Sequence, residues 1–209
     1  MDYDVLSDEF FEQMRNRVQQ RLRKQRFEHV ESVAQTAITI AKEYGLDWRR
    51  ARLAAILHDW DKDISDEAII KRAKELGVVT DAYVMDTMPR LLHGLTAAAA
   101  LKREYPEIPQ DVLDAVAYHT SACIGMTELD MVVYIADVIE PLRPFPATQK
   151  LRDKVGKISL EDLFLRTFKQ VFSNLIESNY RVHPSTVDVW NYYLVRARER
   201  KRNRKKGLL

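Results

Sequence analysis

Apolar residues recur at three- and four-residue steps along most of the chain, which is the period of an amphipathic helix. The first run, Phe10 to Leu22, follows Ser7, a residue type that favours the N-cap of a helix. A second face runs from Val30 to Ala41 and precedes Gly45, which can close a helix in a left-handed conformation. A third, strongly amphipathic face lies between residues 163 and 176. The pattern therefore predicts helices in both halves of the chain.

Capping residues, and prolines that open or end helices, mark the boundaries of the other expected elements. These are Asp47, Ser65, Gly77, Pro89, Pro106, Pro109, Thr127 with Asp130, Pro141, Ser159 with Asp162, and Ser185 with Asp188. No segment alternates with period two over enough residues to predict a strand, and the sequence contains no internal repeat or Gly/Ser linker. We therefore expect a single all-α domain.

A length of 209 residues with 46% hydrophobic content is enough for one compact core. The longest apolar stretches fall well short of the about 20 residues that span a membrane, and no secretory signal opens the chain. Cys123 is the one cysteine, which excludes an intramolecular disulfide and fits a cytoplasmic protein. It has no adjacent base, so we interpret it as a structural residue.

The net charge of +2 conceals a basic C-terminus in which Glu199 is the only acidic residue. Its basic residues are Arg196, Arg198, Arg200, Lys201, Arg202, Arg204, Lys205 and Lys206. Such a segment could contact RNA or another anionic surface. The simpler interpretation is a solvated helix end, and no aromatic residue interleaves it for base stacking.

Four of the five histidines and two aspartates lie in or beside apolar helical runs: His29, His58, Asp59, His93, His119 and Asp137. Asp137 interrupts an apolar run with no basic residue adjacent to it, and a buried carboxylate needs a cation or several donors. These residues together predict a metal site. Nitrogen and oxygen ligands without thiolates suit Fe, Mn, Co, Ni or Zn, and the residues alone do not choose among them.

The adjacent pair His58-Asp59 suggests how two metal ions could share this site. Neighbouring helical residues point about 100° apart, so both reach one site only near a helix end or a kink. A carboxylate can bridge two ions and an imidazole binds one, which makes Asp59 the expected bridge. His29, His58 and Asp137 would complete one shell; His93 and His119 would complete the other. Two ions about 3.5–4 Å apart could bind a phosphate oxygen and activate a water that attacks the phosphate. The residues therefore predict a metal-dependent phosphohydrolase.

Two basic residues are candidates for binding phosphate. Lys62 follows His58 by one helical turn and would act as a point charge, whereas Arg143 follows Pro141 and could form a fork of hydrogen bonds. The alternative for both is an ordinary surface salt bridge. His183 stands outside the pattern, and we interpret it as structural.

The order His, His-Asp, Asp resembles that of the HD-domain metal-dependent phosphohydrolases, and the two intervening histidines resemble the dinuclear version. Longer strings resemble the YqeK-type family of symmetrical bis(5'-nucleosyl)-tetraphosphatases. They are Arg26 to Val30, Ala54 to Asp59 with Lys62, Ala117 to Thr120, Ile135 to Pro141 with Arg143 and Phe145, and His183 to Thr186. The resemblance covers about residues 21–195, with a helical extension over 1–20 before it and the basic tail over 196–209 after it.

The resemblance implies a helical bundle that cuts diadenosine tetraphosphate into two ADP with two divalent ions, iron first among them. The six residues above would be its metal ligands. Asp59, Lys62 and His93 would take part in catalysis, and Lys62, Thr120 and Arg143 would contact the nucleotide. No membrane is implied, and an oligomer is compatible with the sequence.

One loop departs from the family pattern. Members continue from the His-Thr pair with Thr-Gly and a basic residue, whereas this chain has Ser121, Ala122 and Cys123. Losing the glycine alters backbone freedom, and losing the basic side chain removes a phosphate contact. Two other functions therefore stay open: an HD nucleotidase acting on another nucleotide, and a non-catalytic, metal-bearing module that docks on RNA or the ribosome.

Overall fold

The computed structural model describes residues 4–143 and 146–205. Phe145 of the family-like string and Lys206 of the basic tail lie outside the described residues. Across the described ranges the chain is helical without strands, which confirms the all-α prediction. The elements are α1 (Asp8–Arg21), α2 (Lys24–Glu43), α3 (Trp48–Leu57), α4 (Asp66–Glu75), α5 (Ala82–Thr87), the 3-10 helix η1 (Pro89–Leu92), α6 (His93–Glu104), α7 (Gln110–Tyr118), α8 (Glu128–Ile139), α9 (Pro146–Arg152), α10 (Leu160–Glu177) and α11 (Thr186–Lys205).

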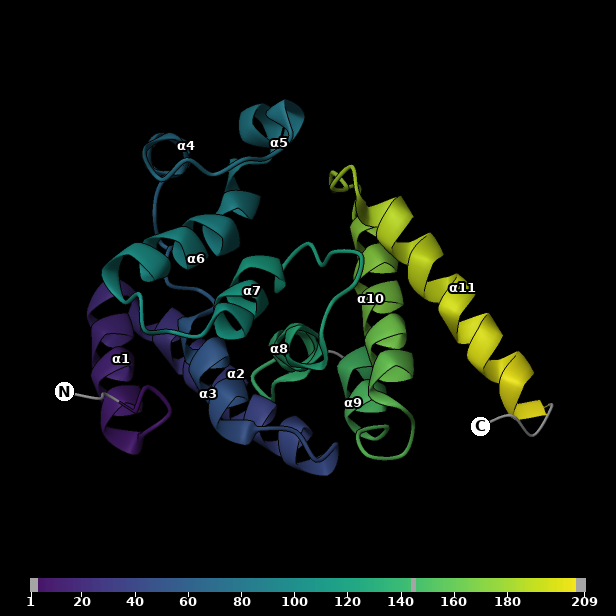
Figure 1. Ribbon diagram of the computed structural model, residues 1–209. Helices are drawn as coiled ribbons and strands as arrows, with labels where there is room; N and C mark the ends of the chain where they lie inside the picture. The colour runs from purple at the N-terminus through teal and green to yellow at the C-terminus, as the bar shows by residue number, and fades with distance from the viewer. Residues whose placement is uncertain (1–3, 144–145, 206–209) are drawn as a thin grey trace.

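Helix α8 is the centre of the bundle. It packs against α2, α3, α7 and α10, and α6 in turn covers α7 (Figure 1). Its residues 131–136 are all buried, because a helix with neighbours on every side must be apolar all round. Asp137 follows directly on this buried run, and its side chain is 18% exposed, so its carboxylate lies at the edge of the interior.

Most of the expected helix boundaries are present in the structure. Ser7, Asp47, Ser65 and Ser159 each accept a backbone N–H as the N-cap of a helix, and Thr127 forms a complete capping box with Asp130. Cap chemistry is local, since the side-chain oxygen reaches an amide two or three residues ahead. The sequence missed the short helices α5 and α9, and Pro89 opens the 3-10 helix that precedes α6.

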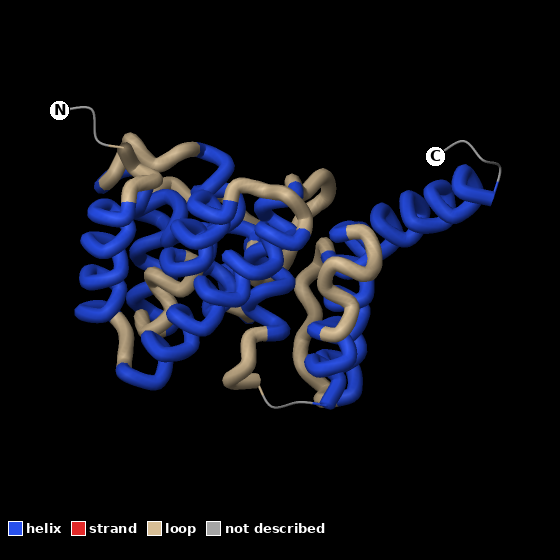
Figure 2. Tube along the Cα trace, turned by 90° about the horizontal axis from the view of Figure 1, so that it is seen from below, coloured by secondary structure: helices blue, strands red, loops and turns tan. Residues whose placement is uncertain are grey.

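The C-terminal helix α11 pairs with α10 and projects beyond the rest of the molecule (Figure 2). The helix continues through residue 196, where we expected the basic tail to begin. Arg196 Nε donates to Glu161 Oε1 at 2.9 Å, and Arg200 Nη2 donates to Asp162 Oδ1 at 2.7 Å. Helix α10 thus supplies acidic partners for part of the basic segment. None of the described helices has the length and apolar content needed to cross a bilayer.

Candidate metal centre

The end of α3 allows His58 and Asp59 to face the same point. The α-helix ends at Leu57, and His58 is its C-cap. The amide of Trp60 then donates to Leu57 O at 3.0 Å and that of Lys62 to Asp59 O at 2.9 Å, which is the tighter i to i+3 pattern. The helix end that this dipeptide requires is therefore present.

Alternate acidic side chains hold the segment after α3 in place. Asp61, 0% exposed, accepts from Arg21 Nη2 of α1 at 3.0 Å and from Arg72 Nε of α4 at 2.7 Å. Asp63 accepts from the backbone amide of Arg23 at 2.8 Å. These bonds tie the segment to α1, to α4 and to the N-cap of α2, and they fix the direction of the neighbouring Asp59.

The hydrogen bonds of the imidazoles set which nitrogen faces the centre. Nδ1 of His58, His93 and His119 lies 2.6, 2.6 and 2.7 Å from the carbonyl oxygen three residues earlier. A carbonyl only accepts, so each Nδ1 carries the hydrogen and each Nε2 presents a lone pair. Nδ1 of His29 faces Glu140 Oε1 at 3.1 Å in the same way. Histidine ligands of metals have this arrangement.

The two oxygens of Asp59 face two different pairs of imidazoles. Oδ1 lies 3.2 Å from Nε2 of His93 and 3.6 Å from Nε2 of His119. Oδ2 lies 3.4 Å from Nε2 of His58 and 4.0 Å from Nε2 of His29. We call His29, His58 and Asp59 the first ligand group, and Asp59, His93 and His119 the second; each could hold a metal ion.

The protonation and the hydrogen bonding of the imidazole nitrogens also fit divalent cations. Nε2 of His93 and of His119 lie 3.0 Å apart, although both present lone pairs. Burial and the neighbouring His58 and His93 lower the pKa of His119 to about 4 against the opposing effect of Asp59, so His119 supplies no proton at neutral pH. Nε2 of His58 is buried without a hydrogen bond, and Nε2 of His29 has only the carboxylate of Asp137 beside it, at 3.0 Å. A cation in the first group would satisfy the nitrogens of His29 and His58, and one in the second group would lie where the two lone pairs of His93 and His119 meet.

Asp137 adjoins the first ligand group, with Oδ1 at 3.0 Å from Nε2 of His29 and 3.9 Å from Nε2 of His58. Arg143 Nη2 also donates to this Oδ1 at 2.7 Å, a partner that the sequence reasoning missed. Burial opposes the ionisation of Asp137, but the contacts with His29 and Arg143 outweigh it and hold its pKa well below the ordinary range. The turn after Pro141 brings Arg143 back towards the helix end.

Lys62 and Thr120 lie against the second ligand group. Lys62 Nζ is 3.3 Å from Nε2 of His93 and 3.9 Å from Oδ1 of Asp59. Thr120 Oγ1 is 2.8 Å from Nε2 of His119 and 3.2 Å from Nε2 of His93. The carboxylate that Lys62 contacts thus belongs to the centre itself. His183 and Cys123 belong to neither ligand group.

The loop after Thr120 keeps a left-handed residue without glycine. Ala122 has φ +57°, a region that glycine enters without steric cost and alanine does not. Ala122 therefore makes this turn at the expense of local strain. The neighbouring Cys123 is half-buried, and burial with nearby acidic groups raises its pKa to about 11, as befits a structural thiol.

A basic cleft of about 680 Å³ adjoins the first ligand group. Its lining includes Arg23, Lys24, Arg26 and Arg143 beside His29. Arg26 Nη1 donates to Asp59 Oδ2 at 3.0 Å, yet the sequence reasoning gave Arg26 no role. Its position three residues before His29, hence on the same helix face, was the available signal. Each of these four cations has a carboxylate partner, and an anionic chain such as a polyphosphate could bind where it shares them.

Comparisons with known proteins show which proteins the chain is similar to. The model of the HD domain family matches residues 26–142. The symmetrical bis(5'-nucleosyl)-tetraphosphatase of Bacillus subtilis (strain 168) is 36% identical over 178 residues, which cover 84% of this chain and 92% of that protein. The protein of the same name from Staphylococcus aureus (strain NCTC 8325 / PS 47) is 33% identical over 185 residues, covering 87% and 93%.

A solved structure has the same arrangement of helices. It is a crystal structure from Clostridium acetobutylicum, described as a predicted HD superfamily hydrolase involved in NAD metabolism. The TM-score is 0.82 at 28% sequence identity, and the match covers 89% of this chain and 97% of that chain. Sequence and fold thus point to the same group of proteins.

Proposed function

The chain belongs to the HD-domain family and, within it, to the symmetrical bis(5'-nucleosyl)-tetraphosphatases, and from this we propose that it hydrolyses diadenosine tetraphosphate to two molecules of ADP. The observation that carries the proposal is the shared carboxylate of Asp59, each oxygen of which faces its own pair of imidazole nitrogens. A site for two ions beside a basic cleft fits a substrate whose reacting part is a chain of phosphates.

We assign the metal ligands to His29, His58, Asp59, His93, His119 and Asp137. Two divalent ions held there would supply Lewis-acid stabilisation of phosphate charge and an activated water. Carboxylate and imidazole donors suit several metals, and we propose iron first, as the family resemblance implies, with Mn, Co, Ni and Zn as alternatives. Metal analysis of protein purified without a chelator tests the identity: an iron content near zero beside two equivalents of another metal would overturn it.

The basic side chains around the ligands have distinct tasks in this proposal. Lys62, beside the second group, places its ammonium where negative charge develops on the attacked phosphate. Arg143 holds Asp137 before substrate binds and can turn its planar fork to a phosphate. Arg26, which donates to Asp59, can likewise turn its guanidinium to a phosphate. Thr120 can donate its hydroxyl hydrogen to a phosphate oxygen near the second group.

Product analysis tests the reaction directly. Protein purified without chelator and supplied with Fe(II), Mn(II) or Co(II) is incubated with diadenosine tetraphosphate, and the nucleotides are separated by ion exchange. ADP as the sole product supports symmetrical cleavage, and Asp59→Ala prepared in parallel controls for contaminating hydrolases. ATP with AMP would show attack on a different phosphorus. No turnover in metal-loaded protein, together with turnover of another nucleotide, would overturn the proposal in favour of a nucleotidase.

A further inference from the structure

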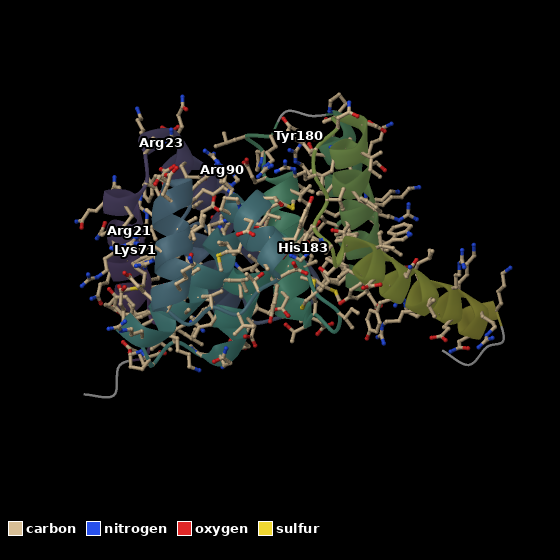
Figure 3. The ribbon with its side chains drawn as sticks, turned by 90° about the horizontal axis from the view of Figure 1, so that it is seen from above. Arg21, Arg23, Lys71, Arg90, Tyr180 and His183 are labelled. Atoms are coloured by element: carbon tan, nitrogen blue, oxygen red, sulfur yellow. The ribbon has the colours of Figure 1, made fainter. Side chains whose placement is uncertain are left out.

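A second, mainly apolar pocket lies between α10 and η1 and has no role in the site described above. Its volume is about 150 Å³, and its lining includes Leu91, Phe168 and Phe172. Arg181 and His183, from the connection between α10 and α11, complete it. Figure 3 shows His183 between the α10–α11 pair and the rest of the bundle. Two phenylalanines from one helix thus form an aromatic wall.

This pocket adjoins the metal centre at the end away from the basic cleft. Thr120 is part of its lining, and Thr120 Oγ1 is within 3.2 Å of Nε2 of both His93 and His119. The basic cleft instead includes His29, a member of the first ligand group. A chain that crosses both groups would therefore have the cleft at one end and this pocket at the other.

The lining is suited to a flat, weakly polar group. Within the described lining, Arg181 is the only charged side chain, so a phosphate would find few partners. Apolar cavities of about 150 Å³ accommodate a benzene ring, and nucleobases stack readily on aromatic side chains. Arg181 Nη1 donates to Thr87 O at 2.7 Å, which holds its guanidinium at the pocket. Guanidinium groups stack on planar rings.

His183 supplies a directional polar group. Its Nδ1 accepts from the backbone amide of Ser185 at 3.2 Å and lies 2.8 Å from the Ser185 hydroxyl. In the neutral ring Nε2 then carries the hydrogen and is a donor. Ring nitrogens of a nucleobase can accept a hydrogen bond from this donor.

We propose that this pocket binds the nucleobase of one half of the dinucleotide, so that its phosphate chain passes Thr120 on the way to the ligand groups. The inference rests on the proposed function, because it takes the substrate from there. It gives His183, so far without a role, a contact with the base. It also makes the molecule asymmetric towards a symmetric substrate: one nucleoside enters an apolar pocket, and the other lies towards the basic cleft.

Adenosine is the probe that separates the pocket from the chemistry, because it has a base and no phosphate and needs no metal. Saturation-transfer NMR is measured on the wild-type chain and on Phe172→Ala, which removes part of the aromatic wall. Ile176→Ala is the matched control, since Ile176 is exposed one turn further along α10 and outside the pocket lining. We expect saturation of the adenine protons in the wild type and the control, and its loss in Phe172→Ala.

A second variant guards against misfolding. Val171→Trp fills the pocket that Phe172→Ala empties, and circular dichroism reports whether each variant is folded. On diadenosine tetraphosphate, both should raise KM about tenfold, the low end of what loss of a base stack costs, with kcat unchanged. If the adenine protons of adenosine are saturated at the wild-type level in both folded variants, the pocket proposal is overturned. Turnover of diadenosine tetraphosphate in the same samples would still uphold the proposed function. Phe172-dependent adenosine binding without any hydrolysis would support the pocket and refute the function.

Discussion

Glu140 gives the sharpest test of whether His29 is a metal ligand. The carboxylate is 1% exposed, and its Oε1 faces Nδ1 of His29 at 3.1 Å. Its Oε2 accepts from the hydroxyl of Ser32 and from the amide of Leu142, each at 2.6 Å. A carboxylate behind an imidazole fixes the tautomer, so that Nε2 stays free for a metal, and it makes that nitrogen a stronger donor. The perturbation is Glu140→Gln, which keeps the shape and removes the charge.

The magnitude follows from the donors that surround Glu140. A glutamine amide has one NH2 group, and either orientation turns it towards a donor, Nδ1 of His29 or the amide of Leu142. One buried donor is left unpaired, which costs about 1–3 kcal/mol of folding free energy. Loss of the carboxylate behind the ligand costs about 10–100-fold in metal affinity, or about 1.4–2.7 kcal/mol. His93 and His119 are held by backbone carbonyls, so the second ligand group should be unaffected.

The assay is a titration of chelator-stripped protein with Mn(II), in which electron paramagnetic resonance counts the free ion. We expect two similar sites in the wild type, and in Glu140→Gln one unchanged site with one that is about 10–100-fold weaker. Ser32→Ala is the control, because it removes one bond to Oε2 and leaves the carboxylate behind His29. Two sites of wild-type affinity, with a lowered Tm, would refute the reasoning, since the Glu140 carboxylate would then stabilise the fold without supporting metal binding through His29.

Three further substitutions test the other parts of the centre. Asp59→Ala should abolish binding of both ions, by metal analysis, and turnover with it; full activity would refute the bridge. Lys62→Ala should keep both ions and lower kcat/KM by about 100-fold, whereas an unchanged value would make it an ordinary salt-bridge residue. Gly94→Ala places a Cβ 2.7 Å from Ala117 O and 2.9 Å from Val116 O. The added Cβ should push α6 away from α7, which should lower the free energy of unfolding by about 1–3 kcal/mol and weaken metal binding by the second ligand group. Calorimetry and metal titration measure the two effects, and a wild-type Tm would contradict the close packing.

The sequence predicted those parts of the fold that depend on neighbours in the chain. Ser7 and Asp47 cap their helices through amides two or three residues away, so the pattern could be read directly. Helix α5 has six residues, too few to show a period, and its buried Val84 packs with residues of α4 and η1. Only the folded chain brings that cluster together, and the helix was missed for this reason.

The same division holds at the centre. The candidate ligands could be selected because imidazoles and carboxylates stand out in apolar runs, and Asp59 was expected to face two ways because a carboxylate has two oxygens. Arg26 and Glu140 were assigned no role, since charged residues at helix ends are common on any surface. Their partners Asp59 and His29 are 33 and 111 positions away in the sequence. Only the packing of α2 against α3 and α8 brings these charges to the candidate ligands.

Helix α1 lies in the stretch that we expected to be an extension, but it takes part in positioning the centre. Its Phe10, Met14 and Val18 are buried in the main core, so the helix is packed on the domain. Arg21, its last residue, holds the fully buried Asp61 together with Arg72 of α4. A buried carboxylate that loses one of its cations is strongly destabilised. Asp61 lies two residues after Asp59, which both ligand groups share, so α1 contributes to the geometry of both groups although none of its residues belongs to them.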